Sequence, residues 1–569
     1  MSREFSVHWL EDTVEKIMSR NPLEITLSTG KTPSGHIHVG ILREIIICDA
    51  LTRIFDKKGK KVNFYLFLDD FDAAKRFPDY IDIKFQREHI GKPFALIPCP
   101  FKDCRCESYA RHFGNELIST FKGFGIKNEI VWTFALYKER RMQEKIKIAL
   151  ENIDEIKRIL KKYIFPTLDG EKKERFVEMQ KTWMPVMVLC EECDRIQEKG
   201  EDGSIKPNRV ISYSRDDHEV FYNCPACGHQ GKISIYSGRL KLNWRIDWPA
   251  KWSLFNTSCE PAGKDHCVKG GSYDTGLEIS QRIYNYQGPV KLSYEWLRLG
   301  DQDMKTSKGI VFTPKRFQEL ADPEIYRMLI LRTNPMKHIS LRIEELSQYY
   351  NYYERMENIY YNIEEAESTQ EKDFFMYLYP LTKIENVPET KPIRIPFNNM
   401  IFLSQVQNLL SKENLFNKAL SWVDREVAEI TLEEFDNLLT RTTNWISEVK
   451  SFINKIGTEK KKKFLLNKIG IFSIPVEINK SLIDKLNKNQ ISGLKLIRDS
   501  IIKEENMNAE KIQNEIFSIA KESLQINPKE LFEALYLVIL GKNSGPRLGS
   551  FMALLDKEWL QRRLDFLNI

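Results

Sequence analysis

The sequence has no long hydrophobic run, no strong charge of either sign and no internal repeat. No apolar stretch approaches the roughly 20 residues that a membrane-spanning helix needs. The first residues, MSREFSVHWLEDT, are charged and lack the apolar centre of a signal peptide. The 86 basic and 80 acidic residues leave a net charge of +6, too small a bias to indicate a nucleic-acid partner by itself. These absences predict a cytoplasmic globular protein that has no membrane partner.

The length of 569 residues is enough for about three or four domains with their own cores. Hydrophobic residues make up 42% of the chain and charged residues 29%, as in ordinary globular proteins. Charge is uneven only between Lys450 and Arg498, where twelve Lys and Arg face three Asp and Glu. This segment is either a solvated helix face or a contact for a nucleic-acid backbone.

Ten cysteines without a secretory signal indicate metal binding rather than disulfides, and seven of them fall in two short groups. Cys190 and Cys193 form one CxxC pair, and Cys224 and Cys227 form a second one thirty residues later. Tetrahedral zinc takes four such thiolates. We therefore predict a structural zinc site, although a redox CxxC motif is the alternative.

The second group consists of Cys99, Cys104, Cys106 and His112. These four soft ligands are close together in the chain, but their spacing fits no common zinc motif. They form either a second structural zinc site or a set of scattered buried thiols. The other three cysteines, Cys48, Cys259 and Cys267, are predicted to lie in the core.

The stretch Ser28–Gly40, STGKTPSGHIHVG, is the most informative part of the chain, and we call it the signature turn. Residues 23–27 before it alternate as a buried strand does. Residues 41–55 after it place apolar side chains at helical spacing. The signature turn therefore connects a strand to a helix, where backbone N–H groups and the positive helix end attract phosphate.

Within the signature turn, Pro33, Gly35 and Gly40 allow a tight backbone path and close approach of a ligand. His36 and His38 offer imidazole N–H donors beside that path. A surface turn that contains two histidines by chance is the alternative. A second polar loop, DQDMKTSKG at 301–309, makes that alternative weaker, because its lysines suit phosphate as well.

Coarser patterns predict how the remaining elements are arranged. We expect strands over 62–70 and 289–299, a hairpin of 232–236 with 240–247, one amphipathic helix over 140–163, and helices without strands of note from Thr313 onward. The first of these strands ends in Asp69, Asp70 and Asp72. Carboxyl ends of strands are where open α/β sheets bind ligands, so these acids are site candidates, with solvated loop acids as the alternative.

The signature turn and the loop at 301–309 together resemble the HIGH and KMSKS signatures of class I aminoacyl-tRNA synthetases. Further stretches resemble the class I lysyl-tRNA synthetases in particular, over nearly the full chain length. These stretches are Glu107–Ala110, Trp244–Pro249 with Trp252, Glu260–His266, Gly271–Gly276, Leu540–Lys542 and Gly545–Leu548. Two departures stand out: Ile41 replaces the second HIGH histidine, and Asp303 and Lys305 replace the first lysine and first serine of KMSKS.

The resemblance implies an α/β Rossmann-type catalytic domain with a zinc-binding insertion, followed by an all-α C-terminal anticodon-binding domain. The implied divisions are 1–96 and 232–312 for the catalytic domain, 97–231 for the insertion, 313–396 for a helical connector, and 397–569 for the anticodon-binding domain. It also implies a monomer that converts lysine and Mg²⁺-ATP to lysyl-adenylate and transfers the lysine to the 3′ end of tRNA(Lys).

Residue roles follow from the resemblance position by position. The implied lysine-binding residues are Gly30, Thr32, Trp244, His266 and Tyr294. The implied ATP-binding residues are Pro33, Ser34, Gly35, His38, Gly40, Gly263, Asp265, Ser307 and Lys308. The implied catalytic residues are His36, His38, Lys305 and Lys308. Trp and Tyr faces suit the lysine ammonium, which also needs a carboxylate partner that the sequence does not identify. A core aromatic on a strand is the alternative for Trp244.

Three other functions remain open. A class I synthetase for another amino acid, glutamate above all, shares the two signatures and the zinc insertion. A catalytically inactive zinc-ribbon RNA-binding protein would use the basic segment and the helical C-terminus. A small-molecule nucleotidyltransferase would share the HIGH-type turn, but it would not need a large helical domain.

Overall fold

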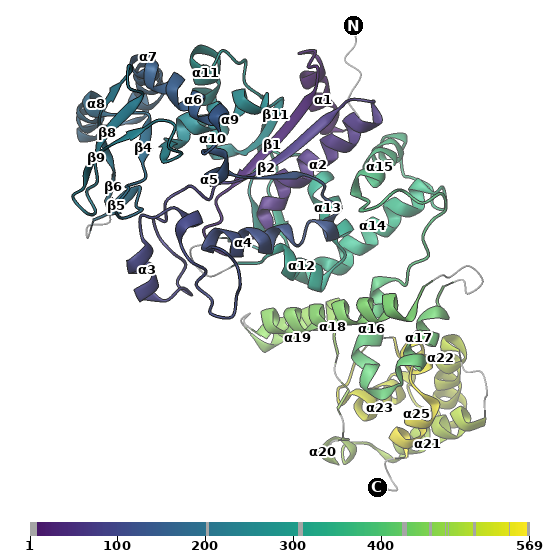
Figure 1. Ribbon diagram of the computed structural model, residues 1–569. Helices are drawn as coiled ribbons and strands as arrows, with labels where there is room; N and C mark the ends of the chain where they lie inside the picture. The colour runs from purple at the N-terminus through teal and green to yellow at the C-terminus, as the bar shows by residue number, and fades with distance from the viewer. Residues whose placement is uncertain are drawn as a thin grey trace. The chain divides into compact units, whose positions relative to one another are not determined.

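The computed structural model describes residues 8–200, 204–304, 311–423, 430–454, 458–472, 474–475, 477–478, 480–503, 508–545 and 547–565. The predicted site residues Lys305, Ser307 and Lys308 lie outside these ranges, as does Pro546. The chain divides into two compact units (Figure 1). The first unit comprises Met1–Gln318, Asp322–Leu341 and Met356–Val387; the second comprises Glu319–Ala321, Arg342–Arg355 and Pro388–Ile569. Among the described helices, none has the length and apolar character needed to cross a membrane.

The first unit is built on a five-stranded parallel sheet. In spatial order its strands are β12 (Val290–Tyr294), β11 (Cys259–Gly263), β1 (Ile25–Lys31), β2 (Val62–Leu68) and β3 (Glu129–Trp132). Every neighbouring pair is parallel, and β1 pairs with β2 over its whole length. Parallel strands covered on both faces need mostly apolar residues, which explains why residues 64–68 form an apolar run. The predicted α/β class with a Rossmann-type sheet is confirmed.

The central strand and the helix that follows it frame the signature turn. Strand β1 begins at Ile25, because Leu23 is fully exposed and cannot belong to the buried run that we expected over 23–27. Helix α2 (Leu42–Lys57) packs against β1, β2 and β11 (Figure 1) and confirms the helix expected over 41–55. Its buried face includes three charged residues, Arg43, Glu44 and Asp49, among apolar neighbours.

Shorter helices complete the first unit. They are α1 (Trp9–Met18), α3 (Ile83–His89), α4 (Tyr109–Ile118), α5 (Thr133–Leu136), α6 (Arg140–Glu151), α7 (Ile153–Ile164), α8 (Glu171–Thr182), α9 (Trp244–Phe255), α10 (Lys264–Cys267), α11 (Ser272–Ile283), α13 (Pro323–Leu331) and α15 (Thr369–Thr382). The single helix expected over 140–163 is wrong, since the chain breaks at Asn152 into α6 and α7. Each of the two buries its own apolar stripe in a shared core.

Seven short strands between Val186 and Leu242 form three small sheets, which together we call the cysteine module. They are β4 (Val186–Val188), β5 (Gln197–Lys199), β6 (Ile205–Pro207), β7 (Arg209–Ser214), β8 (Glu219–Asn223), β9 (Gln230–Ser234) and β10 (Leu240–Leu242). The predicted hairpin is wrong: β9 pairs with β8, and β10 pairs with β4. Pairing with β4 buries Leu240 and Leu242 completely. Pairing of β10 with the distant strand β4 thus replaces the hairpin that the Ser237-Gly238 turn would have closed.

Two further observations correct the sequence-based picture. Strand β3 lies within residues 97–231, which we had assigned to the insertion, but it forms an edge of the main sheet. Beyond Thr313 the chain is not purely helical, because β15 (Ile339–Leu341) pairs with β13 (Leu297–Leu299), which also pairs with β14 (Gln302–Asp303). The pairings of β3 with β2 and of β15 with β13 join segments far apart in the chain, and local patterns carry no information about them.

The second unit is helical among its described residues. Its helices are α16 (Phe397–Val406), α17 (Lys412–Leu420), α18 (Leu432–Asn454), α19 (Glu459–Ile469), α20 (Lys480–Ile483), α21 (Lys488–Lys503), α22 (Ala509–Ser518), α23 (Pro528–Leu540), α24 (Leu548–Leu554) and α25 (Lys557–Leu564). Through their described residues, all of them except α19 contribute to one apolar core, which includes Leu403, Leu494, Ile516, Leu535 and Phe551. Helices α12 (Pro314–Leu320) and α14 (Leu346–Tyr360) contribute residues to both units.

Candidate active site and metal centres

A cavity of about 1000 Å³ lies at the carboxyl ends of the sheet strands in the first unit. This is the edge at which open parallel sheets bind ligands. Its wall includes all five predicted lysine-binding residues, Gly30, Thr32, Trp244, His266 and Tyr294. Ser34 and Gly263 from the predicted ATP-binding set also line it, whereas Pro33, Gly35, His36, His38, Gly40 and Asp265 lie outside its wall.

The signature turn begins at the end of β1 and places its two histidines in different surroundings. The Nδ1 atom of His36 lies 2.7 Å from Oε2 of Glu116, and its backbone N–H donates to the hydroxyl of Tyr80. The Nδ1 atom of His38 is buried and has no hydrogen-bond partner in the described structure. Burial, together with the nearby charge of Lys31, lowers the pKa of His38 to about 4. His38 is therefore neutral at physiological pH.

Gly40 lies where the signature turn meets the approach to the lysine-bearing loop. A Cβ atom at this position would lie 2.8 Å from Nδ1 of His38 and 3.6 Å from Cε of Met304. Met304 is buried and immediately precedes the loop residues outside the described ranges. The absence of a side chain at position 40 thus leaves room for the His38 ring within the signature turn, whereas Met304 would be in ordinary van der Waals contact.

Glu44 is the site residue that we did not identify from the sequence. It lies in the first turn of α2, lines the cavity and is 6% exposed. Its carboxylate accepts hydrogen bonds from the hydroxyls of Thr29 and Tyr294. Burial raises the pKa of Glu44 to about 7, and the two hydrogen bonds oppose that rise. The only signal in the sequence was an acidic residue within an otherwise apolar helix face.

A second buried carboxylate in the cavity wall, Glu260 of β11, has a different set of partners. It accepts hydrogen bonds from the Ser28 hydroxyl at 2.6 Å and from the indole N–H groups of Trp248 and Trp252, both at 2.7 Å. Burial raises the pKa of Glu260 against the effect of these donors. Three donors fix this carboxylate within the wall, so Glu260 stabilises α9 against β11.

Of the strand that we expected over 240–247, residues 240–242 form β10, whereas the tryptophan-rich stretch from Trp244 onward forms helix α9. Trp248 and Trp252 share one face of α9, four residues apart, as Asp247 and Lys251 share another. Trp252 is fully buried, whereas Trp244 at the start of the helix is 46% exposed and lines the cavity. Trp244 is therefore neither on a strand nor in the core. His266 contacts the rings of both Trp244 and Trp248.

The three acidic residues after β2 have different roles. Asp69 and Asp72 line the cavity. Asp70 is buried away from the cavity, and its Oδ1 atom accepts the backbone N–H of Phe134 at 2.7 Å. Burial raises the pKa of Asp70 to about 6. Of the three candidates, only Asp69 and Asp72 can meet a ligand.

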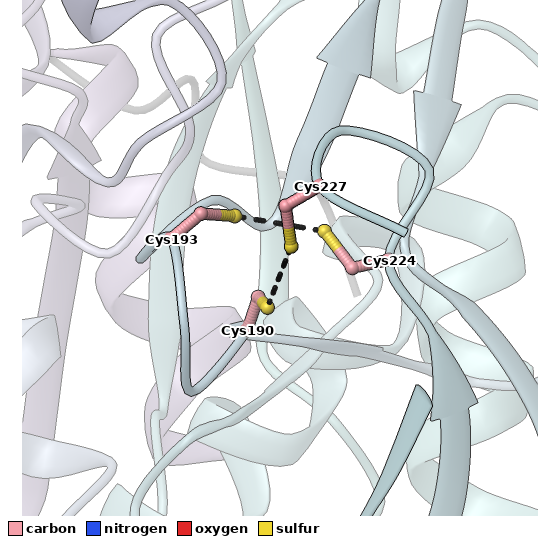
Figure 2. Close-up of side chains that lie close together, drawn as sticks. All are labelled: Cys190, Cys193, Cys224 and Cys227. Carbon is pink, nitrogen blue, oxygen red and sulfur yellow. Dashed lines mark hydrogen bonds between the residues drawn. The ribbon is translucent and has the colours of Figure 1, made fainter. Parts of the chain in front are cut away.

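The four thiols of the cysteine module converge on one point (Figure 2). All four sulfur atoms lie within 4.8 Å of one another, with 3.6 Å between Cys190 and Cys227 and 3.6 Å between Cys193 and Cys224. Tetrahedral Zn²⁺ with bonds of about 2.3 Å requires sulfur atoms roughly 3.8 Å apart. The residues fit a closed structural zinc site, and no ligand position remains for catalysis.

Backbone turns hold these thiols in place. Gly228 has a φ of +76°, which favours glycine, and its N–H donates to the carbonyl of Cys224 at 2.9 Å. The N–H of Cys190 donates to the carbonyl of Arg195 at 3.0 Å. Each CxxC pair thus closes a tight loop shortly after a strand, the first after β4 and the second after β8.

The second cysteine group is less complete. Ligand atoms of Cys99, Cys104 and His112 lie within 4.8 Å of one another, and Sγ of Cys104 lies 3.2 Å from Nδ1 of His112. Cys106 is not a member of this group, although its backbone N–H donates to Sγ of Cys104. Three ligands can hold a metal ion. Of the other cysteines, Cys48 and Cys259 are buried in the core as predicted, and Cys267 is half-buried.

The parallel sheet, the signature turn at the end of β1 and the cavity beside them form the catalytic arrangement of a class I aminoacyl-tRNA synthetase. Residues 7–381 match the family described as tRNA synthetases class I (K), and residues 462–567 match an anticodon-binding domain. The chain belongs to this lysine-type class I synthetase family.

Similar proteins cover the chain almost completely. It is 33% identical to a lysine–tRNA ligase of Methanocaldococcus jannaschii, over 98% of this chain and 99% of that protein. It is 32% identical to a lysine–tRNA ligase of Methanococcus maripaludis, with the same coverage. A solved glutamate–tRNA ligase from Elizabethkingia meningosepticum aligns with a TM-score of 0.41 at 11% identity, over 95% of this chain and 99% of that one.

Proposed function

We propose that this protein is a lysine–tRNA ligase that activates lysine with ATP and transfers it to the 3′ end of tRNA(Lys). Similarity to lysine–tRNA ligases over nearly the whole chain favours lysine over glutamate. The signature turn and the cavity argue against a protein that only binds RNA. The anticodon-binding region, 462–567, argues against a nucleotidyltransferase for small molecules.

The observation that carries the proposal is the pairing of Glu44 with Tyr294 in the cavity wall. The charge of Lys31 acts on this buried carboxylate, but both of its hydrogen-bond partners are hydroxyls. A primary ammonium group therefore suits it, because the ligand adds positive charge and three N–H donors. Glu44 is thus proposed as the carboxylate partner of the lysine ammonium. The aromatic faces of Tyr294 and Trp244 accompany that charge and the aliphatic stem.

The chemistry needs no protein nucleophile. The lysine carboxylate attacks the α-phosphate of Mg²⁺-ATP and releases pyrophosphate, and a ribose hydroxyl of the tRNA end then attacks the adenylate carbonyl. The protein positions the reactants and stabilises charge. Neutral His38 retains one imidazole N–H to donate to a phosphate oxygen, and we assign Gly263 and Asp265 to binding of the ATP ribose.

The remaining predicted roles stay part of this proposal. Lys308 neutralises charge on the departing pyrophosphate, while Lys305 and Ser307 assist in the same loop. His36, Pro33, Ser34, Gly35 and Gly40 shape the phosphate-binding turn. Zinc at Cys190, Cys193, Cys224 and Cys227 is structural, and a second ion binds the group around Cys104. The exposed lysines of α19 contact the tRNA backbone, and the protein acts as a cytoplasmic monomer.

Aminoacylation of tRNA tests the proposal. The purified protein would be incubated with ATP, total tRNA and each of the twenty amino acids separately, with pyrophosphate exchange measured with and without tRNA. We expect acid-stable charging with lysine alone. Charging with another amino acid would keep the fold and refute the assignment of the pocket. Binding of tRNA without charging by any amino acid would favour an RNA-binding protein.

A further inference from the structure

A network of charged side chains connects the cysteine module to the signature turn through the cavity wall. Its carboxylates are Asp69 and Asp72 after β2 and Asp247 of α9, and its ammonium groups are Lys241 of β10 and Lys251 of α9. All five residues line the cavity. Lys251 Nζ lies 2.5 Å from Asp69 and 2.9 Å from Asp247, and the Tyr137 hydroxyl donates to Asp247 at 2.6 Å.

Lys241 reaches this network from the cysteine module. Its strand, β10, pairs antiparallel with β4, placing Lys241 opposite Met187. Strand β4 ends at Val188, two residues before the zinc-ligand candidate Cys190. The Lys241 side chain is only 2% exposed, and its ammonium lies 3.2 Å from Asp72 and 3.6 Å from Asp247. The backbone of Lys241 thus belongs to the cysteine module, and its charge lies in the cavity wall.

Asp72 carries the connection onward to the signature turn. One carboxylate oxygen faces Lys241, and the other accepts the Thr32 hydroxyl at 2.8 Å. Thr32 follows β1 directly and lines the cavity. A continuous chain of contacts therefore runs from the cysteine ligands through β4, β10, Lys241 and Asp72 to Thr32.

The balance of charges indicates why a lysine occupies position 241. Burial disfavours a charged Lys241, but the carboxylates of Asp247 and Asp72 outweigh that effect and raise its pKa. Buried ion pairs contribute little net stability compared with apolar side chains of the same size. A methionine would fill the same space, so the ammonium at position 241 serves a purpose other than packing.

We propose that Lys241 is a positioning residue through which the cysteine module holds Asp72 and Thr32 in the geometry that binds lysine. This inference rests on the proposed function. The rival explanation is purely electrostatic: Lys241 repels the lysine ammonium and only tunes the charge of the wall. The two explanations predict opposite signs, because loss of the charge weakens lysine binding in the first case and strengthens it in the second.

The test is calorimetric titration of L-lysine, with and without tRNA, into the full-length wild type, Lys241→Met and Lys241→Arg. We expect lysine binding to weaken roughly tenfold in Lys241→Met and to recover in part in Lys241→Arg. ATP affinity and zinc content should stay at wild-type values. Lys232→Met is the matched control, since Lys232 lies on β9 of the same module and pairs with Glu219 at the surface; it should bind lysine normally.

Two further measurements distinguish a role of Lys241 in positioning Asp72 and Thr32 from a role in folding. The double variant Lys241→Met/Asp72→Ala removes both members of the Lys241–Asp72 pair, while Asp247 keeps Lys251 as its partner. It should therefore recover part of the thermal stability lost in Lys241→Met while lysine binding stays weak. Chelation of zinc should weaken lysine binding in the wild type and have no additional effect in Lys241→Met. Unchanged or tighter lysine binding in folded Lys241→Met would overturn the inference. A double variant that recovers both thermal stability and lysine affinity would also overturn it. A wild type that binds no lysine would instead refute the proposed function.

Discussion

The two buried glutamates of the cavity wall differ in what surrounds them. Glu260, between α9 and β11, accepts hydrogen bonds from one hydroxyl and two indole N–H groups, and an indole can only donate. Glu44, between α2 and β12, accepts hydrogen bonds from two hydroxyls, which can rotate and can also accept. The protein's own donors therefore fix Glu260 more firmly than they fix Glu44. On the proposed function, the same residue type at similar burial has a structural role at position 260 and a ligand-binding role at position 44.

The largest expected effect comes from removing the charge at position 44. Glu44→Gln should lower kcat/KM for lysine in tRNA charging by about 10²- to 10³-fold, because the buried ammonium loses its partner. Steady-state charging assays with varied lysine measure this effect, and the KM for ATP should change little. Activity within threefold of wild type would show that the ammonium binds elsewhere.

Changing Glu260 should instead lower the stability of the protein and leave its lysine kinetics nearly unchanged. Glu260→Gln places an amide NH₂ against an indole N–H donor, so one buried donor loses its acceptor. We expect a loss of about 1–3 kcal/mol in the free energy of unfolding, measured by chemical denaturation. The kcat/KM for lysine should stay within about threefold of wild type. A large kinetic defect without a loss of stability would contradict the structural role of Glu260.

The pH dependence should distinguish the two sites further. The raised pKa of Glu44, about 7, means that the empty site is protonated at acidic pH, and only the ionised form attracts an ammonium. KM for lysine should therefore fall about tenfold between pH 6 and pH 8 and level off above. Measurement of KM across this range in the wild type and in Glu44→Gln checks the prediction, because the variant should show no such dependence.

The same shift predicts a gain in stability when the carboxylate is removed. A carboxyl whose pKa is higher in the folded state than its ordinary value of 4.5 loses stability as pH rises from 4.5 to about 7. At pH 8, Glu44→Gln without ligand should therefore be more stable than wild type by about 1–3 kcal/mol. Thermal unfolding at pH 5 and pH 8 measures this difference, which should be small at pH 5.

The smallest expected effect is at the aromatic rim of the cavity. Trp244→Ala should raise KM for lysine about three- to tenfold through the loss of packing and cation–π attraction. Trp244→Phe should retain part of the affinity. Because Trp244 is half exposed, the thermal unfolding midpoint should hardly change. An unchanged KM in Trp244→Ala would remove Trp244 from the lysine site.

Features set by local sequence were predicted well. Residues 41–55 formed α2, the apolar run from Val62 formed β2, and the two CxxC pairs brought four thiols together. In each case a short pattern carries its own physical cause, either apolar periodicity or the ligand preference of zinc. The position of the cavity was also predictable, because the signature turn and the acids after β2 both lie at the carboxyl ends of strands.

Features set by distant pairing were not predictable in the same way. The alternation in residues 240–247 resembled a strand, yet the i, i+4 spacing of Trp248 with Trp252 and of Asp247 with Lys251 satisfies helix α9. Residues 129–132 gave no sign that they would join the main sheet. Glu44 was missed because its importance depends on Tyr294, which lies 250 residues away.

Discrimination between lysine and norleucine tests the central claim most directly, since norleucine has nearly the same shape and lacks the ammonium. Binding of both to the wild type, Glu44→Gln and Glu260→Gln would be measured by calorimetry in the presence of tRNA. We predict a strong preference for lysine in the wild type and in Glu260→Gln, and loss of that preference in Glu44→Gln. A preference for lysine that persists in Glu44→Gln would contradict the assignment of Glu44 as the partner of the lysine ammonium.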